Sequence, residues 1–306
     1  MKYLVIGAGG TGGCIGAHMT VAGKDVTLIA RGNHLKAMQE NGLRMETTKK
    51  GNYVVNPIKA TTMEDYRENP DVIFVCVKGY SLQETIPFIK KVAKEDTVVI
   101  PILNIYGTGG KLQKELPELL VTDGCIYVAS QIKEPGCIWQ NGDIFRVVYG
   151  VRESREYRDI LQSVKKDLED SDIEAVLSEN IRRDALQKFS YVSPAAACGQ
   201  YYNAKAEAMQ KPGEIRDTFI ALMEEVNKLA LAMGITFETD IVKTNLAILD
   251  SLTPQASTSM QRDIEQGKSS EVDGLVYEVV RLAKEYGVDT PTYKMIADTL
   301  QKQNIS

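Results

Sequence analysis

Residues 2–12 read Lys-Tyr-Leu-Val-Ile-Gly-Ala-Gly-Gly-Thr-Gly, an apolar run that leads into a Gly-x-Gly-x-x-Gly pattern. The apolar run predicts a short buried strand over 3–6, and residues 11–22 predict a helix. A strand, a glycine turn and a helix are the context in which this pattern binds a dinucleotide, with the pyrophosphate at the helix N-terminus. We expect the cofactor to be bound by Gly7, Ala8, Gly9, Gly10, Thr11 and Gly12.

The end of the second predicted strand, over 25–30, bears on which dinucleotide is bound. NAD-binding proteins usually carry Asp or Glu there, which accepts a hydrogen bond from the ribose 2′-hydroxyl. This chain has Arg31 instead. A guanidinium accepts no hydrogen bond but pairs well with a 2′-phosphate. The sequence therefore favours NADPH/NADP+, with a merely solvated arginine as the alternative.

Strands and helices continue to alternate through the first half. The apolar runs over 71–77 and 97–103 are typical of parallel strands covered on both faces, and residues 82–93 predict a helix between them. Repeated strand–helix–strand order predicts a mainly parallel, doubly wound sheet.

A later stretch, 119–149, is rich in β-forming residues. It carries turn signals at Pro135-Gly136 and Asn141-Gly142. We expect it to add strands to the same sheet.

Beyond about residue 179 the pattern becomes helical. Apolar residues recur at helical spacing from 215 to 233 and again from 272 to 286. Ser270 and Asp273 are spaced as a capping pair at the start of the second stripe.

These patterns predict an α/β protein with a Rossmann-type doubly wound parallel sheet, followed by an all-helical C-terminal domain. We expect a dinucleotide-binding domain over 1–175 and a helical substrate and catalytic domain over 176–306. The helical domain could support a homodimer.

Composition narrows the function class. A net charge of −5 argues against a general nucleic-acid or membrane-surface binder. No apolar run approaches the ~20 residues of a membrane span, and no signal-peptide pattern is present. Five scattered cysteines are typical of free thiols in a reducing compartment, so we expect a cytoplasmic protein.

The chain has only two histidines, His18 and His34. Neither is well placed to protonate a substrate over a nicotinamide, so another residue type is the expected proton donor. A histidine-rich metal site is equally unexpected, and we predict no metal.

Polar residues follow two of the predicted parallel strands. Lys78 comes after 71–77 and Asn104 after 97–103. Ligands of open α/β sheets bind at that edge. Alone, either residue would more simply be an exposed lysine or a turn asparagine.

The ordered set of motifs resembles the ketopantoate reductase family from Lys2 to about Asp298. Besides the glycine loop, Arg31, Lys78-Gly-Tyr and Asn104-x-x-Gly, it consists of Gln187-Lys188-Phe189, Ser259-Met260-x-x-Asp263 and Ser270-Glu271-Val272-Asp273.

The resemblance implies reduction of 2-dehydropantoate to pantoate with NADPH, in pantothenate and coenzyme A biosynthesis. It makes Lys188 the general acid that protonates the ketone oxygen, and Glu271 the acid that binds the substrate hydroxyl. Ser259 would help to hold the substrate carboxylate. Lys78 and Asn104 would lie beside the nicotinamide, with Asn104 also orienting the substrate.

The sequence departs from the family where asparagines commonly grip the substrate. The lysine helix has Ser193 but no asparagine before Asn203, Ala256 stands at another such position, and Ile105 follows Asn104 where glycine is common. Ser193 is the candidate replacement contact. The departures leave open an NADP-dependent reductase of another 2-oxo acid or ketone, and, in another class, a non-catalytic NADP-binding sensor.

Overall fold

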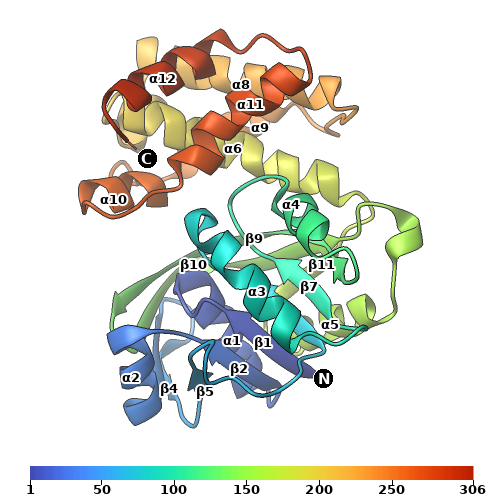
Figure 1. The fold of residues 1–306 in the computed structure, drawn as a ribbon. Coiled ribbons are helices and arrows are strands. Elements are labelled where there is room, and N and C mark those ends of the chain that lie inside the picture. The colour runs from blue at the N-terminus through green and yellow to red at the C-terminus, as the bar shows by residue number, and fades with distance from the viewer. Residues whose placement is uncertain (306) are drawn as a thin grey trace. The chain divides into compact units, whose positions relative to one another are not determined.

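A computed structural model describes residues 1–305 (Figure 1). The chain divides into two compact units, which we call the sheet unit (Met1–Leu103 and Gly107–Ile181) and the helical unit (Asn104–Tyr106 and Arg182–Ser306). Ser306, the last residue of the predicted helical domain, lies outside the described residues. The boundary predicted at 175 stays a prediction, because compactness does not show that either part folds independently.

The sheet unit is built on a six-stranded parallel sheet in the order β5-β2-β1-β6-β7-β8. The sheet order reverses beside β1, which pairs with β2 on one side and with β6 on the other. This is the doubly wound order that the strand–helix alternation predicted. Its strands are β1 (Lys2–Ile6), β2 (Asp25–Ile29), β5 (Lys59–Thr61), β6 (Val72–Val75), β7 (Val98–Pro101) and β8 (Leu120–Val121).

The strands of this sheet are apolar throughout because both faces are buried. Tyr3 and Val5 belong to one core cluster, whereas Leu4 and Ile6 belong to another on the opposite face. Successive side chains of a strand point to opposite faces, so a continuous apolar run is what a sheet covered on both sides requires.

A second sheet corrects one expectation about residues 119–149. Only β8 joins the parallel sheet. β9 and β10 belong to a separate five-stranded sheet, in which four strands follow the order β11-β10-β3-β4 and β9 pairs with β10. Its strands are β3 (Leu43–Thr47), β4 (Gly51–Val55), β9 (Asp123–Glu134), β10 (Cys137–Gly150) and β11 (Glu174–Leu177).

The two turn signals in this stretch have different outcomes. Pro135-Gly136 is the turn between β9 and β10, with Gly136 at φ +75°. Asn141-Gly142 was wrongly expected to be a turn. It lies inside β10, where the pairing register shifts between Asn141 and Phe145 and Gly142 has φ +76°. A glycine with positive φ serves a bulge as well as a turn, so the sequence signal was ambiguous.

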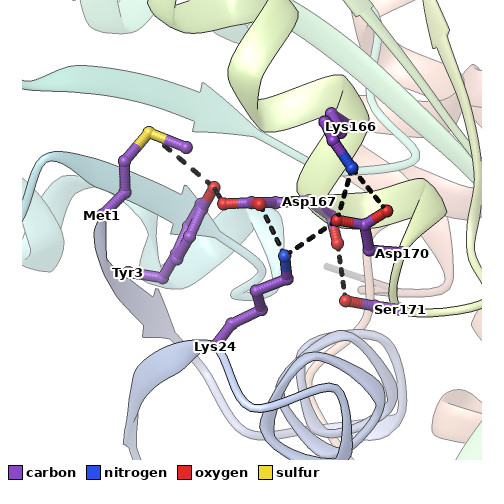
Figure 2. A network of polar contacts seen from close by, with 7 residues as sticks. All are labelled: Met1, Tyr3, Lys24, Lys166, Asp167, Asp170 and Ser171. Atoms are coloured by element: carbon purple, nitrogen blue, oxygen red, sulfur yellow. Dashed lines mark hydrogen bonds and ion pairs between the residues drawn. The ribbon is translucent and has the colours of Figure 1, made fainter.

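Helices complete the sheet unit, and a polar network fixes the last of them to β1. Figure 2 shows Tyr3 of β1 donating to the Asp167 carboxylate at 2.6 Å, while Lys24 bonds the same carboxylate at 2.7 Å. Tyr3 and Asp167, which are 164 positions apart in the sequence, are thereby joined within the unit. Its helices are α1 (Gly10–Val21), α2 (Gly32–Asn41), α3 (Leu82–Val92), α4 (Thr108–Glu115) and α5 (Ile160–Glu169), with 3₁₀ turns at Gly79–Ser81 and Ser154–Glu156.

The helical unit contains no strand among the residues described, as predicted. Its apolar stripes meet in one core, in which α8 packs on α7, α9 and α12. Its elements are α6 (Ile181–Tyr201), α7 (Ala206–Gln210), α8 (Glu214–Ala232), α9 (Ile241–Ser251), α10 (Ser259–Glu265), a π-helical segment (Asp273–Tyr277), α11 (Glu278–Glu285) and α12 (Pro291–Lys302).

The expected capping pair of Ser270 and Asp273 forms only in part. The Ser270 hydroxyl accepts from the Val272 N–H at 3.4 Å, but the Asp273 carboxylate pairs with Arg281. An ion pair with a residue eight positions later thus takes the place of the reciprocal capping bond.

Within residues 1–305, no helix is both long enough and apolar enough to cross a bilayer.

Candidate active site

The glycine loop after β1 has the geometry that its sequence pattern requires. Gly7 has φ +99°, and a Cβ there would lie 2.9 Å from the Cys76 carbonyl oxygen. At Gly12, a Cβ would lie 2.1 Å from the Gly7 carbonyl oxygen. Side chains are therefore excluded at both positions by close packing of backbone on backbone.

Gly9 differs from these two glycines because its surroundings are open. Apart from Gly9 itself and its two neighbours in the chain, no described heavy atom lies within 4 Å of the position that a Cβ on Gly9 would take. Gly9 is also the N-cap of α1, whose first turn contains no acidic residue. The N–H groups and the positive end of the helix dipole are thus left for an anion, as a pyrophosphate site requires.

The loop lies at the point where the sheet order reverses. β1 and β6 are neighbours there, and the Cys76 N–H donates to the Ile6 carbonyl at 2.8 Å. Lys78 follows two residues later and starts the 3₁₀ turn, with its carbonyl accepting from Ser81. Ligands of open α/β sheets bind at such reversal points.

Arg31 lies at the start of α2, beyond the end of β2. It is the N-cap residue in an extended conformation (φ −145°, ψ 163°) and it is exposed. The β2 end is tied to the glycine loop, because the Ile29 carbonyl accepts from the N–H groups of Gly7 and Ala8 at 3.2 and 3.0 Å. A group bound along the loop therefore has this segment beside it.

His34 is a residue of this region whose role the sequence analysis missed. Its Nδ1 accepts from the Gly136 N–H at 3.0 Å, so its Nε2 carries the proton and donates to the Ala8 carbonyl at 2.9 Å. The neutral ring thus joins the glycine loop to the β9–β10 turn. Burial lowers its pKa, which favours this neutral form. The only sequence signal was a histidine one helical turn after Arg31.

In the helical unit the predicted catalytic lysine meets the predicted asparagine. Lys188 Nζ, on α6, donates to Asn104 Oδ1 at 2.6 Å. Asn104 comes three positions after the last residue of β7, so the chain leaving the sheet carries this amide to the lysine. An amide oxygen at this distance orients the ammonium group.

The two residues after Asn104 also pack in the helical unit. The Tyr106 ring lies 6.1 Å from that of Phe189, the neighbour of Lys188. The Ile105 side chain covers Gly274. Three successive residues are each anchored, which explains why 104–106 cluster with the helical unit.

Helix α6 continues through Pro194 because another residue satisfies the carbonyl that the proline leaves unpaired. Proline has no N–H for the carbonyl four residues earlier. That carbonyl belongs to Ser190, and the buried Asn245 donates to it from Nδ2 at 3.0 Å. The helix is therefore stabilised at Ser190, two residues after Lys188.

Ser193 does not occupy a position suited to its predicted role as a substrate contact. Its side chain is fully buried, and its hydroxyl lies 2.5 Å from the Leu275 carbonyl and 2.6 Å from the Tyr293 hydroxyl. These partners lie in the π-helical segment and α12. Ser193 therefore joins three elements of the helical core, and we do not carry it into the proposed site.

Ser259 and Glu271 lie at the starts of helical elements. Ser259 is the first residue of α10; Thr258 caps the helix by a reciprocal arrangement with Gln261. Glu271 is buried, and its carbonyl accepts from the Leu275 N–H at 2.9 Å. Both residues thus have fixed backbones, which suits groups that must hold a substrate.

The described residues hold no group of three or more His, Cys, Asp or Glu side chains placed to bind a metal ion. The chemistry that these side chains can perform is proton transfer and hydrogen bonding, with a cationic lysine and a buried carboxylate in one unit and an anion-binding loop in the other.

Comparisons with known proteins identify the family. The model "Ketopantoate reductase PanE/ApbA" matches residues 3–154, and its C-terminal counterpart matches 180–304. The chain is 25% identical to the uncharacterized oxidoreductase YkpB of Bacillus subtilis, over 98% of both chains. It is 26% identical to a 2-dehydropantoate 2-reductase of Pyrococcus horikoshii, over 95% of this chain and 93% of the relative.

A solved structure shares the whole fold. D-mandelate dehydrogenase, with NADH and anilino(oxo)acetate bound, superposes with a TM-score of 0.86 over 99% of this chain and 98% of its own, at 20% identity. The chain belongs to the ketopantoate reductase family, as its motifs predicted. It is an oxidoreductase that acts on a keto or hydroxyl group and depends on a pyridine nucleotide.

Proposed function

We propose that this member of the ketopantoate reductase family reduces a 2-oxo acid to the 2-hydroxy acid with NADPH, and that 2-dehydropantoate is its substrate in pantothenate and coenzyme A biosynthesis. The observation that carries the proposal is the 2.6 Å hydrogen bond between Lys188 and Asn104. This bond orients the ammonium group of Lys188, the residue to which the family motif assigns the role of proton donor.

The glycine loop would hold the dinucleotide. The open space at Gly9 and the uncapped N-terminus of α1 fit a pyrophosphate, and Lys78 would lie beside the nicotinamide. When bound, the reduced dinucleotide supplies the hydride. Arg31 would pair with a 2′-phosphate, which NADH lacks, and this supports NADPH as the preferred form.

The residues of the helical unit would handle the substrate and its proton. Lys188 donates a proton to the ketone oxygen as negative charge develops there, and Asn104 keeps the ammonium group oriented. Glu271 accepts from the new hydroxyl. Ser259, at the N-terminus of α10, donates to the substrate carboxylate, which the helix dipole also favours.

A reductase of another 2-oxo acid is the second candidate, and a specific observation supports it. The asparagines common in the family are absent, and Ser193, the residue expected to replace one of them, is engaged inside the helical core. The substrate contacts therefore differ from those that the family motif describes.

Steady-state assays of NADPH oxidation at 340 nm, with 2-dehydropantoate beside a panel of other 2-oxo acids, test the proposal. Selective turnover of 2-dehydropantoate is the expected result. A clear preference for another acid would support the assignment as a 2-oxo acid reductase but contradict the assignment to pantothenate and coenzyme A biosynthesis. NADPH binding without turnover of any acid would favour the non-catalytic sensor.

The homodimer and the cytoplasmic location stay predictions. Light scattering of the purified protein and fractionation of cells that express it would test them.

A further inference from the structure

A proline removes a hydrogen-bond donor from the helix that carries Lys188. Helix α6 continues through Pro194, which therefore lies in its interior. The proline nitrogen has no N–H to donate to the carbonyl four residues earlier, and that carbonyl belongs to Ser190. Ser190 is fully buried, and a buried carbonyl without a donor is costly. The Ser190 carbonyl therefore requires a donor from outside its own helix.

The buried Asn245 of α9 supplies this donor, and its influence extends to the residue before Lys188. Asn245 Nδ2 lies 3.0 Å from the Ser190 carbonyl oxygen and 3.0 Å from the Ser190 hydroxyl oxygen. The same hydroxyl donates to the Gln187 carbonyl at 2.6 Å. One amide thus bonds a main-chain carbonyl after Lys188 directly and one before it through a hydroxyl group.

The turn that these bonds hold is the turn from which Lys188 reaches Asn104. Lys188 Nζ donates to Asn104 Oδ1 at 2.6 Å. The direction of a long side chain is set relative to its own turn of the helix. Displacing a reacting group by about 1 Å can slow an enzymatic step about a hundredfold. The bonds from Asn245 therefore bear on where the proposed proton donor stands.

We propose that Asn245 is a positioning residue for the reaction: it replaces the donor that Pro194 lacks, and so holds the turn of α6 that presents Lys188. This inference rests on the proposed function, because it takes Lys188 as the proton donor. Asn245 acts through Ser190 and Gln187 rather than on the substrate. It belongs to none of the family motifs found in the sequence.

Removing the amide is the first test. The readout is kcat and KM, measured separately with NADPH and the 2-oxo acid that the unaltered protein turns over best, with kcat referred to the folded fraction. Asn245→Ala and Asn245→Leu, which is closer to asparagine in size, should each lower kcat about tenfold, less than loss of the proton donor itself. The KM for NADPH should stay within about twofold, because the glycine loop belongs to the sheet unit.

Restoring the missing backbone donor is the second test. Pro194→Ala returns an N–H to the position that faces the Ser190 carbonyl. Added to Asn245→Ala, it should bring kcat back to within about threefold of the unaltered protein, whereas Pro194→Ala alone should change kcat less than about twofold.

A third test asks whether the effect requires Lys188. Adding Asn245→Ala to Lys188→Ala should lower the residual kcat no further, because residues that act as a unit are not additive. A purely structural loss would instead lower kcat by the same factor in both backgrounds.

Gln210 provides the matched control. Its side-chain amide also donates to main-chain carbonyls, those of Leu249 and Leu252 at the end of α9, at 2.8 and 3.0 Å. Gln210→Ala therefore removes the same kind of bond from the same helix and should leave kcat unchanged.

The outcomes separate the inference from the function on which it rests. Unchanged kcat in the Asn245 variants, failure of the rescue by Pro194→Ala, or an equal loss with and without Lys188 would overturn the positioning role and leave the reductase in place. Absence of turnover of every 2-oxo acid by the unaltered protein would overturn the proposed function.

A further variant decides if the Asn245 variants do not fold. Ser190→Ala keeps the carbonyl bonded to Asn245 but breaks the link to Gln187. It should lower kcat with the KM for NADPH unchanged, and an unchanged kcat would overturn the inference.

Discussion

The glycine loop and the surroundings of Lys188 differ in how far the sequence alone could predict them. The loop is made of backbone, and its requirements are steric: a Cβ at Gly12 would meet the Gly7 carbonyl oxygen at 2.1 Å, whereas one at Gly9 would meet nothing within 4 Å. The surroundings of Lys188 depend on side chains from distant parts of the chain: Asn104 bonds the lysine itself, and Asn245 bonds the Ser190 carbonyl on the same helix. Spacing alone reveals the first kind of site, while the second kind needs the fold.

The largest expected effect concerns the side-chain site. Lys188→Ala should lower kcat about a hundredfold or more, because it removes the proposed proton donor, and should leave NADPH affinity nearly unchanged. Asn104→Ala should lower kcat less, since the donor remains but loses its orientation. Steady-state kinetics and fluorescence titration with NADPH measure the two quantities.

Lys228, an exposed lysine of α8, provides the control for this experiment. Lys228→Ala should match the unaltered protein in kcat. Turnover retained by Lys188→Ala would remove that residue from the role of general acid.

Replacing Arg31 tests the glycine-loop side of the comparison, because this residue is proposed to set the preference of the protein for NADPH over NADH. Arg31→Ala should weaken NADPH binding by about tenfold or more, the scale of a hydrogen bond to a charged group. NADH affinity should stay the same, because NADH has no 2′-phosphate. Isothermal titration with each cofactor is the measurement, and an equal loss for both would refute the assignment.

Substitutions at two glycines of the loop should affect different quantities, one the affinity for NADPH and the other the free energy of unfolding. Gly9→Ala should weaken NADPH binding about tenfold with little change in the free energy of unfolding, because open space surrounds Gly9. Gly12→Ala should lower the free energy of unfolding by about 1–3 kcal/mol, the usual cost of overpacking. Urea unfolding and NADPH titration of both variants would show the contrast; identical behaviour would contradict it.

The smallest effect expected is a pH dependence of stability that involves His34. Burial lowers the pKa of His34 and of His18 below 6.5, so the unfolded chain binds the protons first as the pH falls. The free energy of unfolding should therefore decrease below about pH 6.5 and be unaffected by these groups above it. Urea unfolding at pH 8 and 5.5 measures the slope. His34→Gln should make it shallower, and an unchanged slope would show that the ring is not held neutral.

The sequence predicted what depends on local pattern and missed what depends on long-range pairing. The parallel sheet and the helical half follow from apolar periodicity, so both were foreseen. The separate sheet of β9 and β10 was not, because a strand pattern does not say which strands pair. Asn141-Gly142 was expected to be a turn, since a bulge and a turn require the same positive φ.

The same limit applies to the candidate site. Lys188 and Asn104 were named as separate candidates, and the fold joins them. A serine hydroxyl can bind a carboxylate, but that of Ser193 is hydrogen-bonded to the Leu275 carbonyl in the π-helical segment and to the Tyr293 hydroxyl. The contacts of Gly274 and His34 were not foreseen because their partners, Ile105, Ala8 and Gly136, lie far away in the sequence.

The most direct test of the central claim is to follow the hydride. The protein would be incubated with 2-dehydropantoate and NADPH that carries deuterium at the transferable C4 position, and the product examined by NMR and mass spectrometry. The account predicts pantoate with one deuterium at C2, formed in equal amount to NADP+. Pantoate without deuterium at C2, or bound NADPH with no 2-hydroxy acid formed from any 2-oxo acid, would contradict it.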